Sequence, residues 1–279
     1  MKYLITFCVK FLPLKCFFLK NSAKLTSFFS LRFYCERLFM RDLAFCALSL
    51  NGVDAQKFLQ GQVTVNVETL AENTTCYTAI CSLKGRVQFG LWLKKNSSES
   101  FEIISTADQA EDLAKHIKKF GAFSKIQLET IGTVYPTIQG NHTEFSTEVT
   151  DLNAWQLQAI DTGQAWIQAS TAELFQPQEL RLHQRDGVHY DKGCYLGQEV
   201  VARLWFKAKP KHWLHLIQGS GEAPAPAAKL NNDVEVVNSI ATAEGFKALV
   251  VAKPSALEEL AVQVLALPEH LNGDVARPQ

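Results

Sequence analysis

Cysteine is scarce in most of this sequence: after Cys81 the remaining 198 residues contain one, Cys194. The whole chain of 279 residues has seven, an odd number, with no CxxC pair and no alternation with histidine that would suit zinc. A disulfide framework is therefore not indicated, and we expect free thiols in a reducing compartment. His212 and His215 lie close together without a second pair of ligands, so we expect no metal.

An excess of basic residues is also lacking. The 28 lysines and arginines are balanced by 28 aspartates and glutamates, and from Met40 onward 21 basic residues face 27 acidic ones. A broad nucleic-acid surface needs clustered lysine and arginine, so this balance argues against one and leaves only a local basic patch open. With 47% apolar residues, the length suffices for one large domain or two to three small ones.

The first 39 residues lack apolar runs long enough to span a bilayer, the longest being residues 3 to 9. They hold eight of the 18 phenylalanines and seven basic residues but one acid, Glu36, and the charges are spread unlike those of a secretory signal. We expect this leader to lie outside the fold of a cytoplasmic protein whose translation begins at Met40. The alternative is an organelle transit peptide, which would make the protein mitochondrial.

From Met40 onward, short helical and strand patterns alternate. "LNGVDAQKFLQG" offers Asn51 or Asp54 as a helix N-cap and Gly61 as a stop. The apolar residues on one face of this helix are Ala55, Phe58 and Leu59. "QVTVNV", residues 62 to 67, alternates with period two, which predicts a half-buried strand.

The next pattern, "TCYTAICSLKGRVQFGLWLKK", predicts a β-hairpin that turns at Lys84 and Gly85. The apolar residues expected on one face of its second strand are Val87, Phe89, Leu91 and Leu93. Cys76 and Cys81 lie within the first strand and are expected to be packing residues.

The clearest helical pattern is "TADQAEDLAKHIKKFG". Thr106 and Gln109 have the spacing of a capping box, and Gly121 follows as a stop. His116 lies off the apolar stripe, so we expect it in solvent. The stripe consists of Ala110, Leu113, Ala114 and Ile117.

Strand patterns at residues 101–105 and 125–130 flank this helix, which gives β-α-β order and an α+β class. The composition changes after Phe206, where short strand patterns accompany a Gly/Pro/Ala-rich loop. We therefore predict an α+β region of two lobes at residues 40–206 and a small β-rich domain at residues 207–279.

A polar stretch, residues 175–186, carries Arg181, His183 and Arg185 at alternating positions. A strand or extended loop would point all three the same way. The alternative is a solvated face without a specific role.

The stretch "DKGCYLGQEVVAR" places Cys194 between Gly193 and Gly197 and two residues after Lys192. A nearby cation stabilises a thiolate, and the glycines allow close approach of the backbone, so we expect Lys192 to tune a reactive Cys194. No histidine base accompanies the thiol, which argues against a cysteine hydrolase. The alternative is a buried, inert cysteine. Glu199 and Arg203 would then form an ordinary helix salt bridge.

These residues carry a resemblance to a known family. "KGCYLGQE", residues 192–199, together with Arg203 resembles the signature of the YgfZ-type folate-binding proteins. "LNGVDAQKFLQGQVTVNV", "CSLKGRV" and "FQPQELRL" resemble further segments of that family. The resemblance covers roughly residues 41 to 252.

The family is similar to the glycine-cleavage T-protein. The resemblance implies three small lobes around a central folate-sized cavity and a small C-terminal β-barrel-like domain. It implies tetrahydrofolate or a derivative as cofactor, and iron–sulfur client enzymes as partners whose assembly or repair affects tRNA modification. Cys194 and Lys192 would then be the working pair. The expected folate contacts are Arg181, Arg185, Arg203, Gln198, Glu199 and Tyr195.

Two departures from the pattern bear on the activity. Thr64-Val65-Asn66 stands where the family commonly has Thr-Asn-Asp, and "KGRVQFGL" lacks the acidic residue that the T-protein has after its hairpin. One-carbon transfer needs an acid or base near the reacting amine. We therefore favour an accessory protein over a folate-dependent aminomethyltransferase, and keep a structural binding module with a buried Cys194 as a third reading.

Overall fold

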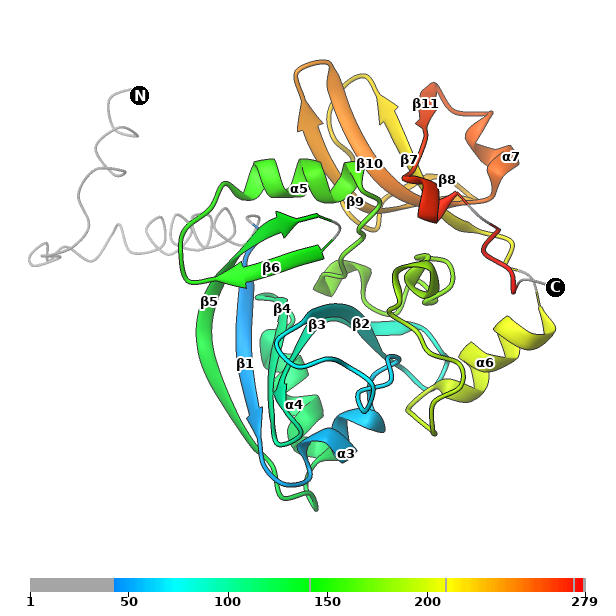
Figure 1. The fold of residues 1–279 in the computed structure, drawn as a ribbon. Coiled ribbons are helices and arrows are strands. Elements are labelled where there is room, and N and C mark those ends of the chain that lie inside the picture. The colour runs from blue at the N-terminus through cyan, green and yellow to red at the C-terminus, as the bar shows by residue number, and fades with distance from the viewer. Residues whose placement is uncertain (1–42, 141, 209, 273, 278–279) are drawn as a thin grey trace, which may run out of the picture. The chain divides into compact units, whose positions relative to one another are not determined.

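The computed structural model describes residues 43–140, 142–208, 210–272 and 274–277. The predictions about the leader and the start at Met40 lie outside these residues. Within them, helices and strands mix as an α+β class requires, and two antiparallel sheets dominate (Figure 1).

The larger sheet has six strands in the order β2-β3-β4-β1-β5-β6. The central β1 pairs on one side with β4 and on the other with β5. Its strands are β1 (Phe45–Asn51), β2 (Thr75–Cys81), β3 (Val87–Ser97), β4 (Ser100–Thr106), β5 (Gln127–Gln139) and β6 (His142–Ser146). The predicted hairpin is confirmed as β2 and β3, and the strands predicted around the 110–120 helix as β4 and β5.

Helices α3 (Ala55–Gln60) and α4 (Ala110–Phe120) cover one face of this sheet. Both predicted helices are confirmed, and their predicted stops Gly61 and Gly121 are the C-cap residues, but neither predicted N-terminal side-chain cap is made. Asp54 occupies the N-cap position of α3, yet its carboxylate accepts a hydrogen bond from the Lys125 amide at 2.7 Å. Gln109 occupies the N-cap position of α4, and its side chain makes no capping hydrogen bond. The Thr106 hydroxyl, the other half of the predicted capping box, donates to the Ile167 carbonyl instead.

His116 is buried, so the prediction that it faces solvent was wrong. Its Nε2 hydrogen bonds to Gln62 Oε1 at 2.9 Å, and its ring packs against Phe89 and Phe120. A polar partner from another segment allows burial that the helical pattern alone does not reveal.

The face of Val87 also differs from the prediction. Phe89, Leu91 and Leu93 contribute to the core under α3 and α4, whereas Val87 joins the core on the opposite side. A register irregularity between Ile80 and Cys81, in the partner strand, accounts for the change, because a shift of one residue reverses the face.

The second sheet has five strands in the order β11-β7-β10-β9-β8, with β11 and β8 at its edges. They are β7 (Trp213–Gly219), β8 (Lys229–Asn231), β9 (Val234–Thr242), β10 (Gly245–Ala252) and β11 (Val262–Leu265), and α7 (Pro254–Leu257) lies between β10 and β11. The strands predicted after residue 207 are thus confirmed. The barrel-like closure and the separate domain remain predictions.

Helix α5 (Leu152–Asp161) lies between the two sheets and contacts β5, β9 and β10 (Figure 1). A direct link lies close by: the Asn238 side-chain amide makes two 2.9 Å hydrogen bonds with the backbone of Trp166. Both groups are buried, so the link joins the β9 strand firmly to the segment that follows α5.

Two predicted extended segments have other structures. Residues 62–67 form turns with a single β-bridge, Val63 to Ile80, although Val63, Val65 and Val67 are buried as the pattern suggested. Residues 182–185 form a 3₁₀ turn, η2 (Leu182–Arg185), because Arg181 and Asp186 both adopt left-handed conformations with φ of 56°. The remaining helical elements are η1 (Ala169–Thr171), α6 (Gln198–Lys207) and η3 (Glu269–Leu271).

Candidate functional site

Cys194 lies on the loop that leads from η2 into α6, and its side chain is exposed. The other described cysteines are less open: Cys46 and Cys76 are half-buried and Cys81 is buried. Burial raises the pKa of Cys76 and of Cys81 to about 12, so these two thiols are poor nucleophiles. They are packing residues, as predicted.

Lys192, two residues away, is only 6% exposed and points into the protein. Its Nζ donates hydrogen bonds to the carbonyl oxygens of Gln60, Val63 and Val65 at 2.8, 2.6 and 2.7 Å. The ammonium also lies 5.0 Å from the ring centroid of Tyr195. Lys192 therefore fastens the Cys194 loop to the segment after α3, which we call the carbonyl cage (residues 60–65).

Burial lowers the pKa of Lys192 to about 7, and Glu68 opposes the shift. The carbonyl cage also favours the ammonium form, since a neutral amine has two N–H bonds for three acceptors. All three donors of the ammonium are already in use, so a direct hydrogen bond to the Cys194 thiolate would break one of them. Tuning of Cys194 by Lys192 stays a prediction, and it would have to act through the electric field alone.

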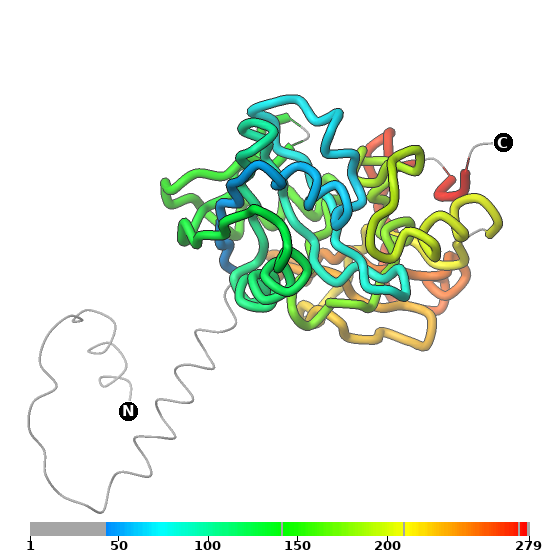
Figure 2. The backbone as a smooth tube through the Cα atoms, turned by 90° about the horizontal axis from the view of Figure 1, so that it is seen from below, coloured from blue at the N-terminus to red at the C-terminus, as the bar shows by residue number. Residues whose placement is uncertain are grey.

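The two glycines around Cys194 differ in their surroundings. Gly197 has φ of +80°, and a Cβ there would lie 2.4 Å from the Ser82 carbonyl oxygen, so no other residue fits without displacement. At Gly193, apart from its two chain neighbours, no atom of the described residues lies within 4 Å of such a Cβ. The close approach of the β2–β3 turn thus explains why residue 197 is a glycine, and this contact packs the start of α6 against that turn (Figure 2). The backbone at Gly193, beside the thiol, has no such close contact.

Helix α6 carries three of the predicted folate contacts. Gln198 donates from Nε2 to the carbonyls of Lys192 and Gly193 at 3.3 and 3.5 Å, which closes the loop around Cys194. Glu199 and Arg203 are exposed, and among the described residues no ion pair joins them. Their side chains are open to a ligand next to the thiol.

Arg181 and Arg185 lie apart from these groups and bind the protein itself. Arg181 is buried and donates from Nε to the Leu214 carbonyl at 3.1 Å, while Arg185 donates to the Thr162 carbonyl at 2.9 Å. Burial lowers the pKa of both guanidinium groups to about 10. The predicted solvated face is therefore wrong for Arg181. Because of the turn at η2, the two arginines and His183 do not form one row, and folate binding by these arginines stays a prediction.

The sequence analysis missed a hydroxyl network behind the loop. Thr64 donates to the Gly187 carbonyl at 2.6 Å and lies 3.0 Å from the Thr78 hydroxyl, and both threonines are fully buried. The amide of Asn66 donates to Nδ1 of His189 at 3.0 Å. The resemblance flagged residues 62–67, but their strand-like alternation hid the role of Thr64 as a bridge to the loop.

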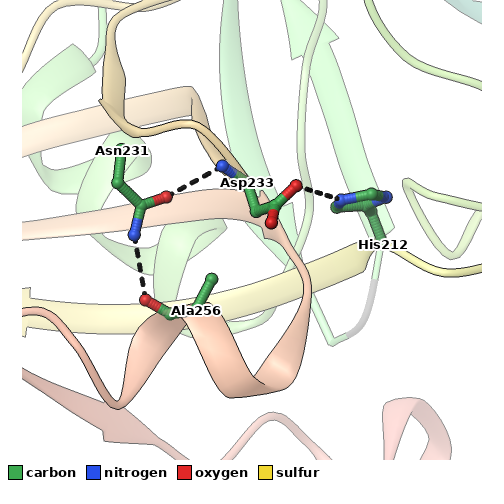
Figure 3. A network of polar contacts seen from close by, with 4 residues as sticks. All are labelled: His212, Asn231, Asp233 and Ala256. Carbon is green, nitrogen blue, oxygen red and sulfur yellow. Dashed lines mark hydrogen bonds and ion pairs between the residues drawn. The ribbon is translucent and has the colours of Figure 1, made fainter.

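Two pockets adjoin the second sheet, and neither is lined by Cys194. One, of about 310 Å³, is lined by β7, α7 and β11 residues such as His215 and Leu257. The other, of about 160 Å³, includes His212 and Asp233, which lie 3.2 Å apart in the network drawn in Figure 3. Neither contains a predicted folate contact, and no group of metal-ligating residues occurs in the described part of the chain.

Comparison with solved structures identifies the fold. The crystal structure of the glycine cleavage system aminomethyltransferase T from Bartonella henselae matches with a TM-score of 0.57 over 79% of this chain and 81% of that one. The sequence identity is 11%, so the likeness concerns the fold alone. The protein thus belongs to the class with a T-protein-like fold.

No family model matches the sequence, but curated relatives do. The tRNA-modifying protein YgfZ of Colwellia psychrerythraea is 28% identical over 64% of this chain and 71% of its own length. An uncharacterized protein of Haemophilus influenzae is 30% identical, with 61% and 70% covered, and YgfZ of Vibrio atlanticus is 24% identical, with 82% and 83% covered. The chain is thus similar to the YgfZ proteins over much of its length, which confirms the resemblance drawn from the motif.

Proposed function

We propose that this protein is a folate-binding accessory factor that supports the assembly or repair of iron–sulfur enzymes and through them affects tRNA modification. The observation that carries the proposal is the presentation of Cys194, an exposed thiol on a loop that Lys192 anchors in the carbonyl cage. A fixed loop holds a thiol in a defined position without burying it, as a working group requires. The name of the relatives, tRNA-modifying protein, supports the link to tRNA.

The aminomethyltransferase activity of the fold neighbour is not carried over. Transfer of a one-carbon unit needs a proton acceptor or donor at the reacting amine. The β2–β3 turn and the start of β3 present Lys84, Arg86 and Gln88 but no carboxylate. An accessory role therefore fits these residues better than the transferase does.

Among the proposed folate contacts, Arg203 is the one most open to the glutamate tail of folate. A guanidinium in solvent can bind a carboxylate through two parallel hydrogen bonds. Gln198 and Glu199 lie on the same helix, and Tyr195 is buried just before it. Arg181 and Arg185 would contribute only if the ligand reached the interior.

Calorimetric titration with tetrahydrofolate tests the cofactor. We expect saturable binding, and Arg203→Ala should weaken it roughly tenfold or more, because a charged hydrogen bond contributes about 1.5–3 kcal/mol. Lys118→Ala, an exposed cation on α4, is the control and should bind as the wild type does. Absence of binding at millimolar tetrahydrofolate would reject the folate part of the proposal.

Complementation in cells that lack the endogenous protein tests the thiol. Cys194→Ser should lose support of iron–sulfur enzyme activity while its melting temperature stays unchanged, since an exposed thiol packs against little. Cys46→Ser, a half-buried position on β1, should retain support. If Cys194→Ser gives full support, Cys194 has only a structural role. The folate part of the proposal would be unaffected, because the titration tests it independently.

A further inference from the structure

An exposed apolar surface lies at one end of the six-stranded sheet, where the β1–α3 loop and the α4–β5 loop come together at the bottom of Figure 1. Val53, Phe120 and Phe123 are 61%, 43% and 103% exposed. Within the described residues, the Phe123 side chain is fully open to solvent. We call these three residues the apolar tip, and a grouped set of exposed apolar side chains marks an interaction surface more often than single ones do.

The two loops that carry the apolar tip are fixed against each other. The Lys125 amide donates to the Asp54 carboxylate at 2.7 Å. Gly52, with φ of +141°, lets the Lys125 carbonyl approach to 2.1 Å from where a Cβ would stand. The tip is thus a preorganised surface and not a pair of independent loops.

Four exposed lysines lie on α3, on α4 and on the α4–β5 loop, the elements that carry or adjoin the apolar tip. Lys119 lies with its Nζ 5.4 Å from the centroid of the Phe120 ring. The acids of the adjoining loops are Asp54, which the Lys125 amide engages, and Glu99 on the β3–β4 turn. The lysines are Lys57, Lys118, Lys119 and Lys125.

We propose that the apolar tip and its four lysines bind the surface of an anionic membrane. Exposed phenylalanines enter the boundary between head groups and acyl chains, and lysines run their stems along the apolar surface while their ammonium groups reach lipid phosphates. No described helix is long and apolar enough to cross a bilayer, so the contact is peripheral. From Met40 onward acids outnumber bases by 27 to 21, so repulsion elsewhere orients the molecule with this end toward the lipid.

The composition favours lipid over a protein partner. The cores of protein interfaces are depleted of lysine but enriched in phenylalanine, tryptophan, tyrosine and arginine, so the lysines of the tip and not its phenylalanines favour lipid. The tip combines phenylalanine and valine with lysine as the only type of basic residue. Phe123 projects outward, so the tip offers no pocket that could accept an anchor residue of an acidic protein partner.

Co-sedimentation of the full chain with vesicles tests the proposal. The wild type should bind phosphatidylcholine vesicles that contain about 30% phosphatidylserine and should not bind phosphatidylcholine alone. Phe123→Ser should lower the partition coefficient about tenfold, and the pair Lys118→Glu with Lys125→Glu at least as much, since each lysine near an anionic surface contributes roughly 1 kcal/mol. All three residues are exposed, so the variants should fold normally.

Leu83→Ser is the matched control, because Leu83 is 78% exposed and lies beside Lys84 on the distant β2–β3 turn. It should bind anionic vesicles as the wild type does. Every variant carries the same residues 1–42, so differences among variants report on the tip. Equal binding by Phe123→Ser and wild type, or binding that ignores phosphatidylserine, would overturn the proposal. So would a lipid-free dimer that Phe123→Ser dissociates, because a second copy would then be the occupant.

Discussion

At the scale of single residues, Lys192 shows how a buried charge can be accommodated. Taking an ammonium out of water is costly unless its hydrogen bonds are replaced. The carbonyl cage supplies three acceptors at 2.6–2.8 Å, one for each N–H of the group. The cage and the lysine therefore depend on each other, since the three carbonyls would otherwise be buried with fewer partners.

Replacing the lysine tests this dependence. Lys192→Met keeps the stem of the side chain but leaves carbonyls of Gln60, Val63 and Val65 unpaired, and it should lower the free energy of unfolding by about 3 kcal/mol or more. Urea denaturation gives the measurement, with the exposed Lys84→Met as control. A Lys192→Met protein as stable as the control, but with slower alkylation of Cys194 at pH 7, would show that the lysine tunes the thiol and does not anchor the loop.

At the scale of elements, the start of α6 depends on how closely it approaches the β2–β3 turn. Gly197 is the N-cap of α6 in a left-handed conformation, and its Cα side faces the Ser82 carbonyl and Cys81. A side chain at this position meets both a strained φ and a backbone atom. The position of the whole Cys194 loop therefore rests on a contact that only glycine permits.

Two glycine variants separate this contact from general loop flexibility. Gly197→Ala should lower the melting temperature by several degrees, because strain and a 2.4 Å contact with Ser82 O must be relieved. Gly193→Ala should melt close to the wild type, because beyond its chain neighbours no described residue comes within 4 Å of the added Cβ. Differential scanning calorimetry compares the two, and equal melting temperatures would contradict the proposed docking of α6.

The elements that the sequence predicted correctly are those with a local signal. Helices α3 and α4 and the β2–β3 hairpin follow from apolar periodicity and turn residues over short windows. Residues 62–67 have the same alternation but form turns, because the Thr64 hydroxyl binds Gly187, 123 residues away. The turn at η2 is flanked by Arg181 and Asp186, both of which have left-handed backbone conformations. Neither residue type allows this conformation to be predicted from the sequence.

The candidate site stays a prediction, and the motif did not reveal its internal arrangement. The motif indicated Cys194 and Lys192 correctly as neighbours in a constrained loop. It could not show that Lys192 points inward, because its acceptors are backbone carbonyls, which every residue type has. Arg181 and Arg185 also donate to the backbone carbonyls of Leu214 and Thr162 in other segments, and such acceptors leave no residue-type signal.

At the scale of the whole molecule, one buried and two half-buried histidines should govern stability in acid. Burial lowers the pKa of His116, His183 and His215 to about 4, with Lys119 adding to the shift at His116 and Arg181 at the other two. In the unfolded chain a histidine protonates near pH 6.5. Between these values the unfolded state binds more protons, so the free energy of unfolding falls as the pH drops from about 6.5 to about 4 and is independent of these groups above 6.5.

His183→Phe should weaken this acid sensitivity. Each such histidine contributes about 1.4 kcal/mol for each pH unit within the window. Within the described residues neither ring nitrogen of His183 has a hydrogen-bond partner, and its ring packs on Trp205, so phenylalanine can replace it. Urea denaturation at pH 8, 6 and 5 should show a smaller loss for the variant, and parallel losses in both proteins would contradict the assignment.

The hydrogen bonds of Lys192 span 127 to 132 residues of sequence, which has a consequence for synthesis of the chain. The carbonyl cage leaves the ribosome long before its lysine, by roughly ten seconds at about 10 residues per second. During that interval the nascent segment after α3 has unpaired carbonyls and buried valines without their native cover, which makes it a candidate for chaperone binding. Contacts of such long range also slow folding. The loop that presents the thiol is thus assembled late, after most of the first sheet has been made.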